Sequence, residues 1–397
     1  MRRIPAGVVA TTALGGVVGL RLLWVAITLA TAADLGFDSF LHSARSASYA
    51  TTSLIVNANP PVSFLLYGPL LFLARNHALL LMTTLSTVAL LSLAVLLRRQ
   101  ARASALTLLW LAAIDPVWCC LYDGQPYAVL ALLAAGAWFT VEKRPLLAGA
   151  LLGCVIAVKP NFALVAVAVA IAGYPLVGVV AGAVAGAASL VPVFVFGPGV
   201  YRRWLASSGP LVRLVRDCPH MAALGHIPAQ FGAPWLSTPL TAAMVAGALA
   251  FVWSRRPDPR SALAAGLALS MAAGPICWTG YALLLFPFIS TRMQSGPVRA
   301  AVLLLLIPGT LLDRLGAPAY LPTLASMSGA RLVILTMNAA GRLVTGSLYS
   351  IAFLFMLAEA LTAVQESRHV DLHPERHVGI APRRPQVGAI PCQAVEP

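Results

Sequence analysis

Charged side chains are scarce in this sequence: Asp, Glu, Lys and Arg make up only 10% of the residues, whereas 59% are hydrophobic. A chain with so few charges lacks the polar surface that a water-soluble globule needs. The mean hydropathy of +0.84 agrees with this shortage. The composition therefore excludes the soluble globular class and places the protein in a lipid bilayer.

Several familiar motifs are also missing. The sequence has no Gly-x-x-x-x-Gly-Lys-Ser/Thr loop, no His-Glu-x-x-His and no Gly-x-Ser-x-Gly, which disfavours nucleotide hydrolysis and zinc or serine hydrolase chemistry. No repeat of fixed period is present, so a solenoid is excluded. The six cysteines include no Cys-x-x-Cys pair, and we expect apolar, unpaired thiols in preference to a disulfide between Cys218 and Cys277.

Apolar runs, in contrast, are abundant. A helix needs about 20 apolar residues to cross a hydrocarbon core of about 30 Å, and several runs are shorter, which favours tilted, broken or paired helices. We predict an all-α, polytopic integral membrane protein with about 11–12 transmembrane helices. The apolar stretches are Ala6 to Ala33, Ala78 to Leu97, Ala105 to Leu121, Tyr127 to Val141, Pro145 to Val158, Phe162 to Gly173, Leu176 to Phe196, Pro239 to Val252, Ala262 to Pro275, Tyr281 to Ile289, Ala300 to Leu312 and Leu343 to Val364.

The distribution of basic residues predicts the orientation. With a cytoplasmic N-terminus, 16 of the 27 Lys and Arg residues fall on inner segments and Arg21 lies within the first span. The positive-inside rule favours this arrangement, so the net charge of +14 reports topology and anionic lipid and does not indicate nucleic acid. We expect a membrane domain over residues 1–364 and a cytoplasmic tail over residues 365–397 with the composition of a disordered segment.

Two polar loops, at about residues 34–77 and 197–237, are expected on the outer face. The first opens with four polar side chains, and if it is helical, steps of four and three residues bring them to one face. An acid, an imidazole and a guanidinium would then combine a base with an anion-binding group. A solvated capping turn is the alternative. The four residues are Asp34, Asp38, His42 and Arg45.

The second loop contains Arg202 and Arg203 next to Tyr201 and Trp204. A basic and aromatic mixture suits the headgroup region and would accommodate a lipid phosphate. Arginines that reach toward headgroups without specificity are an equally good interpretation.

Polar residues at the edges of apolar runs are costly to place in a membrane and are therefore candidate site residues. Lys159 precedes Pro160, and its ammonium either pairs with a phosphate or extends to the membrane surface. Gln125 follows a glycine in a sharp turn and offers a donor and an acceptor to sugar hydroxyls, although a turn alone would explain it. Trp278 and Tyr281 fit an aromatic belt, with sugar stacking as the sharper alternative.

Taken in order, these pieces resemble the bacterial polyprenyl-phosphate-mannose-dependent alpha-1,2-mannosyltransferases, glycosyltransferase family 87, which have the multi-span GT-C fold. The resemblance runs from about residue 6 to about residue 287. Its pieces are an acidic residue opening the first outer loop, Asn59-Pro60-Pro61, Gly124-Gln125, the run from Leu147 to Gly153 that ends in Lys159-Pro160, and Pro275-Ile276-Cys277-Trp278.

The resemblance implies a membrane glycosyltransferase that moves a sugar, mannose in that family, from polyprenyl phosphate to a lipid-linked or cell-envelope glycan. It implies that Asp38 is the general base, with Asp34 as the close alternative and His42 and Arg45 in support. A cation must stabilise the departing phosphate, and Lys159 has the family-like context, with Arg202 and Arg203 as further candidates. The remaining donor or acceptor contacts are Asn59, Gln125, Trp278 and Tyr281.

The same resemblance implies a multi-pass protein of the bacterial inner membrane with the active site on the outer face, and the distribution of basic residues predicts that both termini are cytoplasmic. Its expected partners are the lipid-phosphate donor, the glycan acceptor and membrane lipids. No cofactor is required; a divalent metal is compatible with this chemistry, but no ligand cluster in the sequence argues for one. The sequence leaves the oligomeric state open.

Two other functions fit parts of the sequence. The many spans and edge charges suit a transporter or flippase of lipid-linked sugar, although no inverted repeat is visible. An inactive relative that binds lipid-linked sugar is the third hypothesis, because two family features differ. Tyr127 stands where an asparagine usually follows Gly-Gln, and Gly280 and Tyr281 stand where histidines usually follow the Pro-Ile-x-Trp element.

Overall fold

The computed structural model describes residues 6–31, 59–122, 124–206, 222–309 and 339–371. Within these ranges every regular element is a helix, so the predicted all-α class is confirmed. The predicted residues Asp34, Asp38, His42 and Arg45 lie outside the described part of the chain.

The first half of the chain contains one long helix, a short irregular helical segment, and then a series of paired helices. In order they are α1 (Ala6–Thr31), η1 (Pro61–Ser63), α3 (Phe64–Tyr67), η2 (Gly68–Phe72), α4 (Arg75–Gln100), α5 (Ala105–Ala113), α6 (Asp115–Tyr122), α7 (Tyr127–Thr140), α8 (Pro145–Val158), η3 (Pro160–Phe162), α9 (Ala163–Ile171) and α10 (Pro175–Phe196).

The second half continues the same pattern. Its elements are α12 (His226–Gln230), η4 (Pro234–Leu236), α13 (Ser237–Arg255), α14 (Pro259–Ala273), η5 (Thr279–Leu285), α15 (Phe286–Arg292), α16 (Gly296–Leu305) and α19 (Ala339–Asp371). The last helix extends past residue 364, the predicted end of the membrane domain, and Glu366 on it pairs with Arg292 at 2.6 Å.

Five helical segments among the described residues are long and apolar enough to cross a bilayer, and they coincide with α1, α4, α10, η4 with α13, and most of α19. Large apolar side chains such as Leu20, Val179, Phe194 and Trp253 are exposed on them. In water such exposure would be unfavourable, whereas in a membrane these faces meet lipid. The protein is therefore a polytopic membrane protein.

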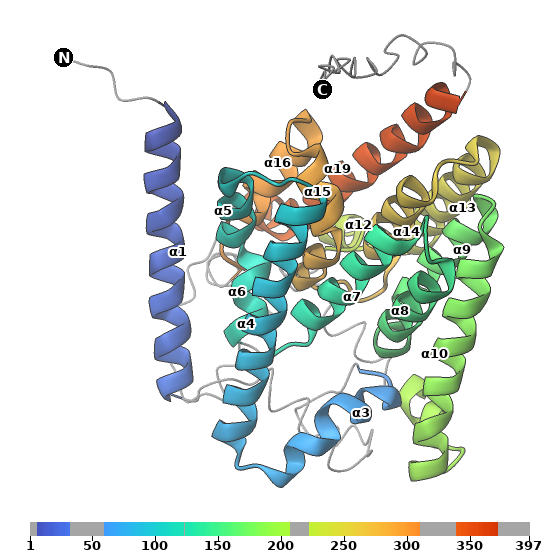
Figure 1. Cartoon of the computed structure of the whole chain (residues 1–397), viewed down its shortest axis with the longest axis horizontal. Helices are drawn as coiled ribbons and strands as arrows, with labels where there is room; N and C mark the ends of the chain where they lie inside the picture. Colours follow the sequence, from blue (N-terminus) through green and yellow to red (C-terminus); the bar gives the residue numbers. More distant parts are fainter. Residues whose placement is uncertain (1–5, 32–58, 123, 207–221, 310–338, 372–397) are drawn as a thin grey trace, which may run out of the picture.

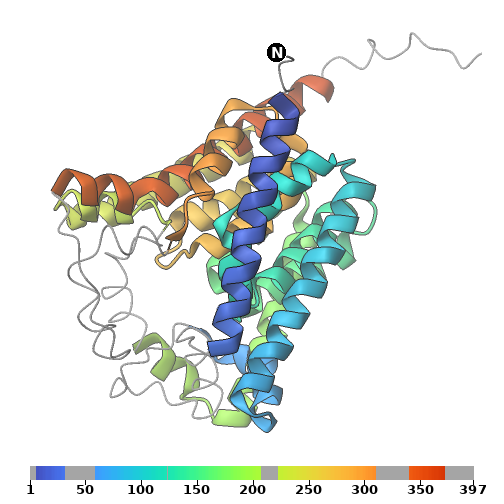
Figure 2. The same cartoon turned by 90° about the vertical axis from the view of Figure 1, so that its left-hand side faces the viewer.

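Figure 1 shows the arrangement of the helices. α1 stands at one side of the bundle beside α4, α10 lies at the opposite side, and the short α3 segment crosses one end of the molecule. α1 begins and α19 ends at the other end, where α4 also finishes with Arg98 and Arg99 in its last turn. Turned by 90°, α19 runs obliquely across the end opposite α3 (Figure 2).

Prolines and capping side chains explain several helix boundaries. The predicted apolar stretch from Ala105 to Leu121 is divided into α5 and α6, and Ile114 between them is extended. In a continuous helix the ring of Pro116 would clash with the carbonyl of Ala112; that carbonyl instead accepts a hydrogen bond from the indole of Trp118 at 2.8 Å. Side chains cap the first turns of α5, α14 and α16. There the N-cap side chains Ser104, Asp258 and Ser295, respectively, accept hydrogen bonds from backbone N–H groups, and an N-cap of this kind contributes about 1 kcal/mol.

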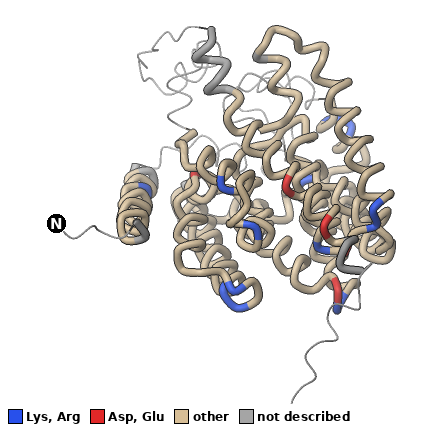
Figure 3. The backbone as a smooth tube through the Cα atoms, turned by 90° about the horizontal axis from the view of Figure 1, so that it is seen from above, with Lys and Arg blue, Asp and Glu red and all other residues tan. Residues whose placement is uncertain are grey.

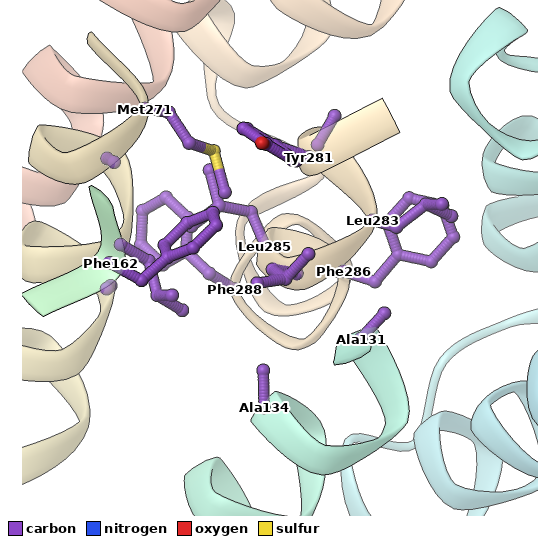
Figure 4. Packing of buried hydrophobic residues seen from close by; sticks show 14 of the residues in the cluster. Ala131, Ala134, Phe162, Met271, Tyr281, Leu283, Leu285, Phe286 and Phe288 are labelled. Atoms are coloured by element: carbon purple, nitrogen blue, oxygen red, sulfur yellow. The ribbon is translucent and has the colours of Figure 1, made fainter. Parts of the chain in front are cut away.

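The 3₁₀ segment η5 lies at the centre of the packed core. All seven of its residues are buried, and it contacts α6, α7 and α14. Figure 4 shows Phe162 from η3 and Met271 from α14 on one side of this segment and Ala131 and Ala134 of α7 on another. A 3₁₀ run of this length is uncommon, and its dense surroundings hold it in place.

Glycines allow α8 and α10 to pack closely. A Cβ atom on Gly149 would lie 2.8 Å from the Val177 carbonyl oxygen, and one on Gly153 would lie 2.7 Å from that of Ala181. Small residues bring helices together in membranes because apolar burial supplies little driving force there. The glycine run ahead of Lys159 therefore fixes α8 against α10.

The substitution Gly153→Ala tests this packing. The added methyl group would meet backbone on α10, so we expect the free energy of unfolding to fall by about 1–3 kcal/mol. Gly182→Ala on α10 is the matched control, because a Cβ there meets nothing within 4 Å and alanine favours a helix. Thermal unfolding of the purified variants measures both; equal melting temperatures would contradict the close contact.

Candidate functional site

The candidate site is built around Lys159, which lies between α8 and η3. Its backbone leaves the helical region (φ −136°, ψ 85°) because the next residue is a proline. The side chain is turned inward, and the residue is only 6% exposed. The sequence left pairing with a phosphate and extension to the membrane surface open, and burial rules out the second.

Three residues from distant parts of the chain surround the ammonium group. Its Nζ atom donates a hydrogen bond of 2.8 Å to Oδ1 of Asn59. It also lies 5.4 Å from the ring centre of Tyr127 and 5.6 Å from that of Tyr281. Asn59 precedes η1, Tyr127 begins α7 and Tyr281 belongs to η5, so this Lys159 cluster joins four segments.

These three partners stabilise a positive charge on Lys159. A hydrogen bond to a charged group contributes about 1.5–3 kcal/mol, and a cation over a desolvated aromatic face contributes about 2 kcal/mol. The amide and the two phenols are neutral groups, so these three contacts hold the ammonium by a hydrogen bond and by ring faces. An ammonium group held in this way is a candidate contact for an anionic ligand.

The two tyrosines are held at right angles. Their ring centres are 5.0 Å apart with an interplanar angle of 87°, and Phe162 packs edge-on against Tyr281 at 5.2 Å. Gly280 makes room for Tyr127, because a Cβ on Gly280 would lie 2.3 Å from the Cδ2 atom of that ring. The position of Tyr127 therefore depends on a glycine in η5.

Gln125 lies next to this cluster in the sequence, in the turn that leads into α7. Gly124 takes the left-handed conformation with φ of 57°, as the predicted turn requires. The backbone carbonyl of Gln125 accepts from Ser86 Oγ at 3.3 Å and from Cys120 Sγ at 3.2 Å. Its side-chain Oε1 is buried without a hydrogen-bond partner among the described residues, which leaves an acceptor for a ligand hydroxyl.

Asn161 provides a second buried polar atom of this kind. It lies two residues after Lys159, and its Nδ2 group has no partner in the described part of the chain. A Cβ on Gly274 would lie 3.3 Å from this nitrogen, so the amide sits against the loop before Trp278. A buried donor without an acceptor is unfavourable in the absence of a ligand.

The other predicted residues are not members of the Lys159 cluster. Trp278 is partly buried at the start of η5 and its carbonyl accepts from the N–H of Tyr281 at 3.0 Å. Arg202 and Arg203 are exposed on the helical residues 200–206 after α10, and Arg203 bonds to the carbonyl of Phe196 at 3.4 Å. The structure thus brings together Asn59, Lys159 and Tyr281, with Gln125 two residues from Tyr127.

Acidic groups in the described ranges have other partners. Glu142 pairs with Arg260 at 2.9 Å, and Glu359 and Glu366 both pair with Arg292. Seen from above, the few acidic positions lie near basic ones (Figure 3). No three or more His, Cys, Asp or Glu side chains converge on a metal position within the residues described.

Tyr127 and Asn161 are site residues that the sequence alone did not identify. Tyr127 stood out only as a departure from the family pattern, and Asn161 only as a neighbour of Lys159. Cys277 is a free thiol, in agreement with the favoured prediction.

The contact between Gly280 and Tyr127 is open to a double-mutant test. Gly280→Ala drives a methyl group into the Tyr127 ring, and we expect it to lower the melting temperature. Tyr127→Ala removes the ring, so in the double variant the new methyl group should cost less than it does alone. Gly296→Ala, at a glycine with open space around it, is the control. Strictly additive melting temperatures would refute the steric coupling.

Comparison with known protein families identifies one family. The model of glycosyltransferase family 87 matches residues 57–287, more than half of the 397-residue chain. The matched range includes Asn59, Gln125, Tyr127, Lys159 and Tyr281. Comparisons with curated proteins and with solved structures gave no significant match. The chain therefore belongs to glycosyltransferase family 87 and is a membrane glycosyltransferase.

Proposed function

We propose that the protein transfers a mannosyl group from polyprenyl phosphate to a lipid-linked or cell-envelope glycan. The observation that carries this proposal is the buried ammonium of Lys159, held by Asn59 and two tyrosine rings. A lipid-phosphate sugar already contains its leaving group, so a cation and a base suffice for transfer. No nucleotide-binding fold is needed for such a donor.

In the proposed reaction the acceptor hydroxyl loses its proton to a carboxylate, Asp38 or its rival Asp34. The acceptor oxygen forms a bond to the anomeric carbon of the sugar. The bond from that carbon to the phosphate oxygen breaks, and the electron pair leaves with the polyprenyl phosphate. Lys159 stabilises the negative charge of the departing phosphate. Attack from the opposite face converts a beta-linked donor into an alpha-linked product.

The buried polar atoms near Lys159 suit the sugar. Gln125 Oε1 offers an acceptor and Asn161 Nδ2 offers a donor, and sugar hydroxyls form both kinds of hydrogen bond. Tyr281 and the partly buried Trp278 supply apolar faces on which a sugar ring can stack. Arg202 and Arg203, exposed after α10, are suited to lipid headgroups.

The arrangement of the helix ends supports an outer-face site in the bacterial inner membrane. Asn59 lies two residues before η1, so the Lys159 cluster is connected to the α3 end of the molecule (Figure 1). Arg98 and Arg99 lie at the opposite end of α4, where α1 begins. From the positive-inside rule we infer that this end is cytoplasmic.

Purified protein, labelled polyprenyl-phosphate mannose and an envelope lipid extract test the reaction. We expect transfer of label, and a loss of about 10²–10⁴-fold in the general-base variant. Asp38→Ala and Asp34→Ala identify which carboxylate is the base. Absence of transfer to every extract, with turnover unchanged in Asp38→Ala, would sink the proposal. Movement of intact donor across sealed vesicles, or donor binding without transfer, would favour the transporter or the inactive relative.

Lys159→Met tests the phosphate contact. Loss of the ammonium should lower the rate at saturating donor by about 10²–10³-fold, because the charge acts on the leaving phosphate. Lys159→Arg keeps the charge and should retain more activity than Lys159→Met. The control is Lys143→Met, at an exposed lysine between α7 and α8, which should behave like the parent protein. Equal rates for Lys159→Met and Lys143→Met would exclude the phosphate role.

A further inference from the structure

α1 has little apolar contact with the rest of the protein. Of its side chains from Val8 to Ile27 only Leu14 and Val25 are buried, whereas Leu20, Leu22 and Leu23 are exposed. It touches α4, α5 and α6 and stands apart at the side of the bundle (Figures 1 and 2). Because lipid is as apolar as leucine, these contacts alone give α1 little reason to dock.

Arg21 is a charged residue within this apolar helix and forms an ion pair with Asp115 at the start of α6. The Arg21 side chain is 13% exposed and that of Asp115 is 2% exposed. Arg21 also donates to the carbonyl of Leu306, just past α16, at 3.0 Å. An isolated arginine in hydrocarbon is costly, so the undocked helix would have to leave it unpaired or move it to the membrane surface.

Asp115 is surrounded by hydrogen-bond donors that belong to the bundle. Its Oδ2 atom accepts from the N–H of Gly309 at 2.9 Å and from Cys119 Sγ at 3.2 Å. The hydroxyl of Tyr349 on α19 lies 3.4 Å from the same oxygen and also 2.5 Å from the carbonyl of Ile307. The bundle thus holds a carboxylate in place, and its Oδ1 atom receives α1.

We propose that the Arg21–Asp115 ion pair docks α1 on the bundle and thereby holds α1 and α6 in the arrangement that sugar transfer requires. α6, which begins at Asp115, leads into Gln125 and Tyr127, and α1 leads to the residues that include Asp34 and Asp38. Arg21 is then a positioning residue that acts through α1. This role rests on the proposed function, whereas the docking of α1 is independent of it.

Two readouts on the full-length protein in vesicles test the proposal. A lipid-soluble carbene precursor labels side chains that face lipid, and mass spectrometry compares the α6 peptide with the η5 peptide. In Arg21→Met we expect several-fold more label on α6 and none gained on the buried η5. The rate of mannosyl transfer at saturating donor should fall by about tenfold or more, with little change in the KM for the donor, because Lys159 is untouched.

Matched variants separate docking from folding. Arg299→Met replaces an exposed arginine and should match the parent in both readouts, and Arg21→Lys should restore most of the labelling pattern and the rate. The double variant Arg21→Met with Asp115→Asn removes both charges, which relieves the penalty of an unpaired carboxylate. This double variant should still show increased labelling of the α6 peptide and a lowered rate of mannosyl transfer.

Each outcome decides the matter. Unchanged α6 labelling in Arg21→Met would overturn the docking role, and increased labelling with an unchanged rate would overturn the positioning role. Label gained on η5 both in Arg21→Met and in the double variant would show a general folding defect and would also overturn the proposal. If the parent protein transfers no sugar from any polyprenyl-phosphate donor, the proposed function fails, while the α6 footprint still tests the anchor.

Discussion

The burial of one ammonium group constrains much of this structure. A charge removed from water is unfavourable unless other groups replace its hydration, and Lys159 obtains that replacement from Asn59, Tyr127 and Tyr281. Each partner must then be held in place by its own surroundings. Glycines pack α8 against α10, Gly280 admits the Tyr127 ring, and the buried η5 carries Tyr281. Local features that look unrelated in the sequence are therefore all part of the surroundings that hold Lys159 and its partners.

The protein buries a second cation in a different way. Arg21 faces a carboxylate, so its charge is balanced and its contacts join α1 to the bundle. Lys159 contacts an amide oxygen and two aromatic rings, which orient its ammonium group. An ion pair is suited to holding two segments together, whereas Lys159 is the cation that we propose for the phosphate of the donor. The cost of burying a charge is thus met by an ion pair at Arg21 and by a hydrogen bond and ring faces at Lys159.

The helices were largely predictable because prolines, glycines and charges mark the ends of apolar runs. α8 has the predicted bounds of Pro145 and Val158, and α1, α4 and α10 lie within a few residues of theirs. The break at Ile114 was missed, since the apolar pattern continues across Pro116. Lys159, Asn59 and Tyr281 were predicted as candidates, but their contact was not, because no periodicity relates residues so far apart. Tyr127 was missed for a similar reason: its role depends on the space that Gly280 leaves.

The Arg21–Asp115 ion pair joins α1, which precedes the range matched by the family model, to a residue within that range. All members of the Lys159 cluster lie within residues 57–287, and their mutual contacts do not involve α1. Arg21 lies before that range and Asp115 lies inside it, so the pair joins the segment that leads to the candidate bases to the matched core. In the proposed reaction the base and the cation act on opposite sides of one sugar carbon, so we expect their separation to depend on this junction. Under that proposal, changes in α1 alter the acceptor side of the reaction, while the contacts of Lys159, which do not involve α1, stay as they are.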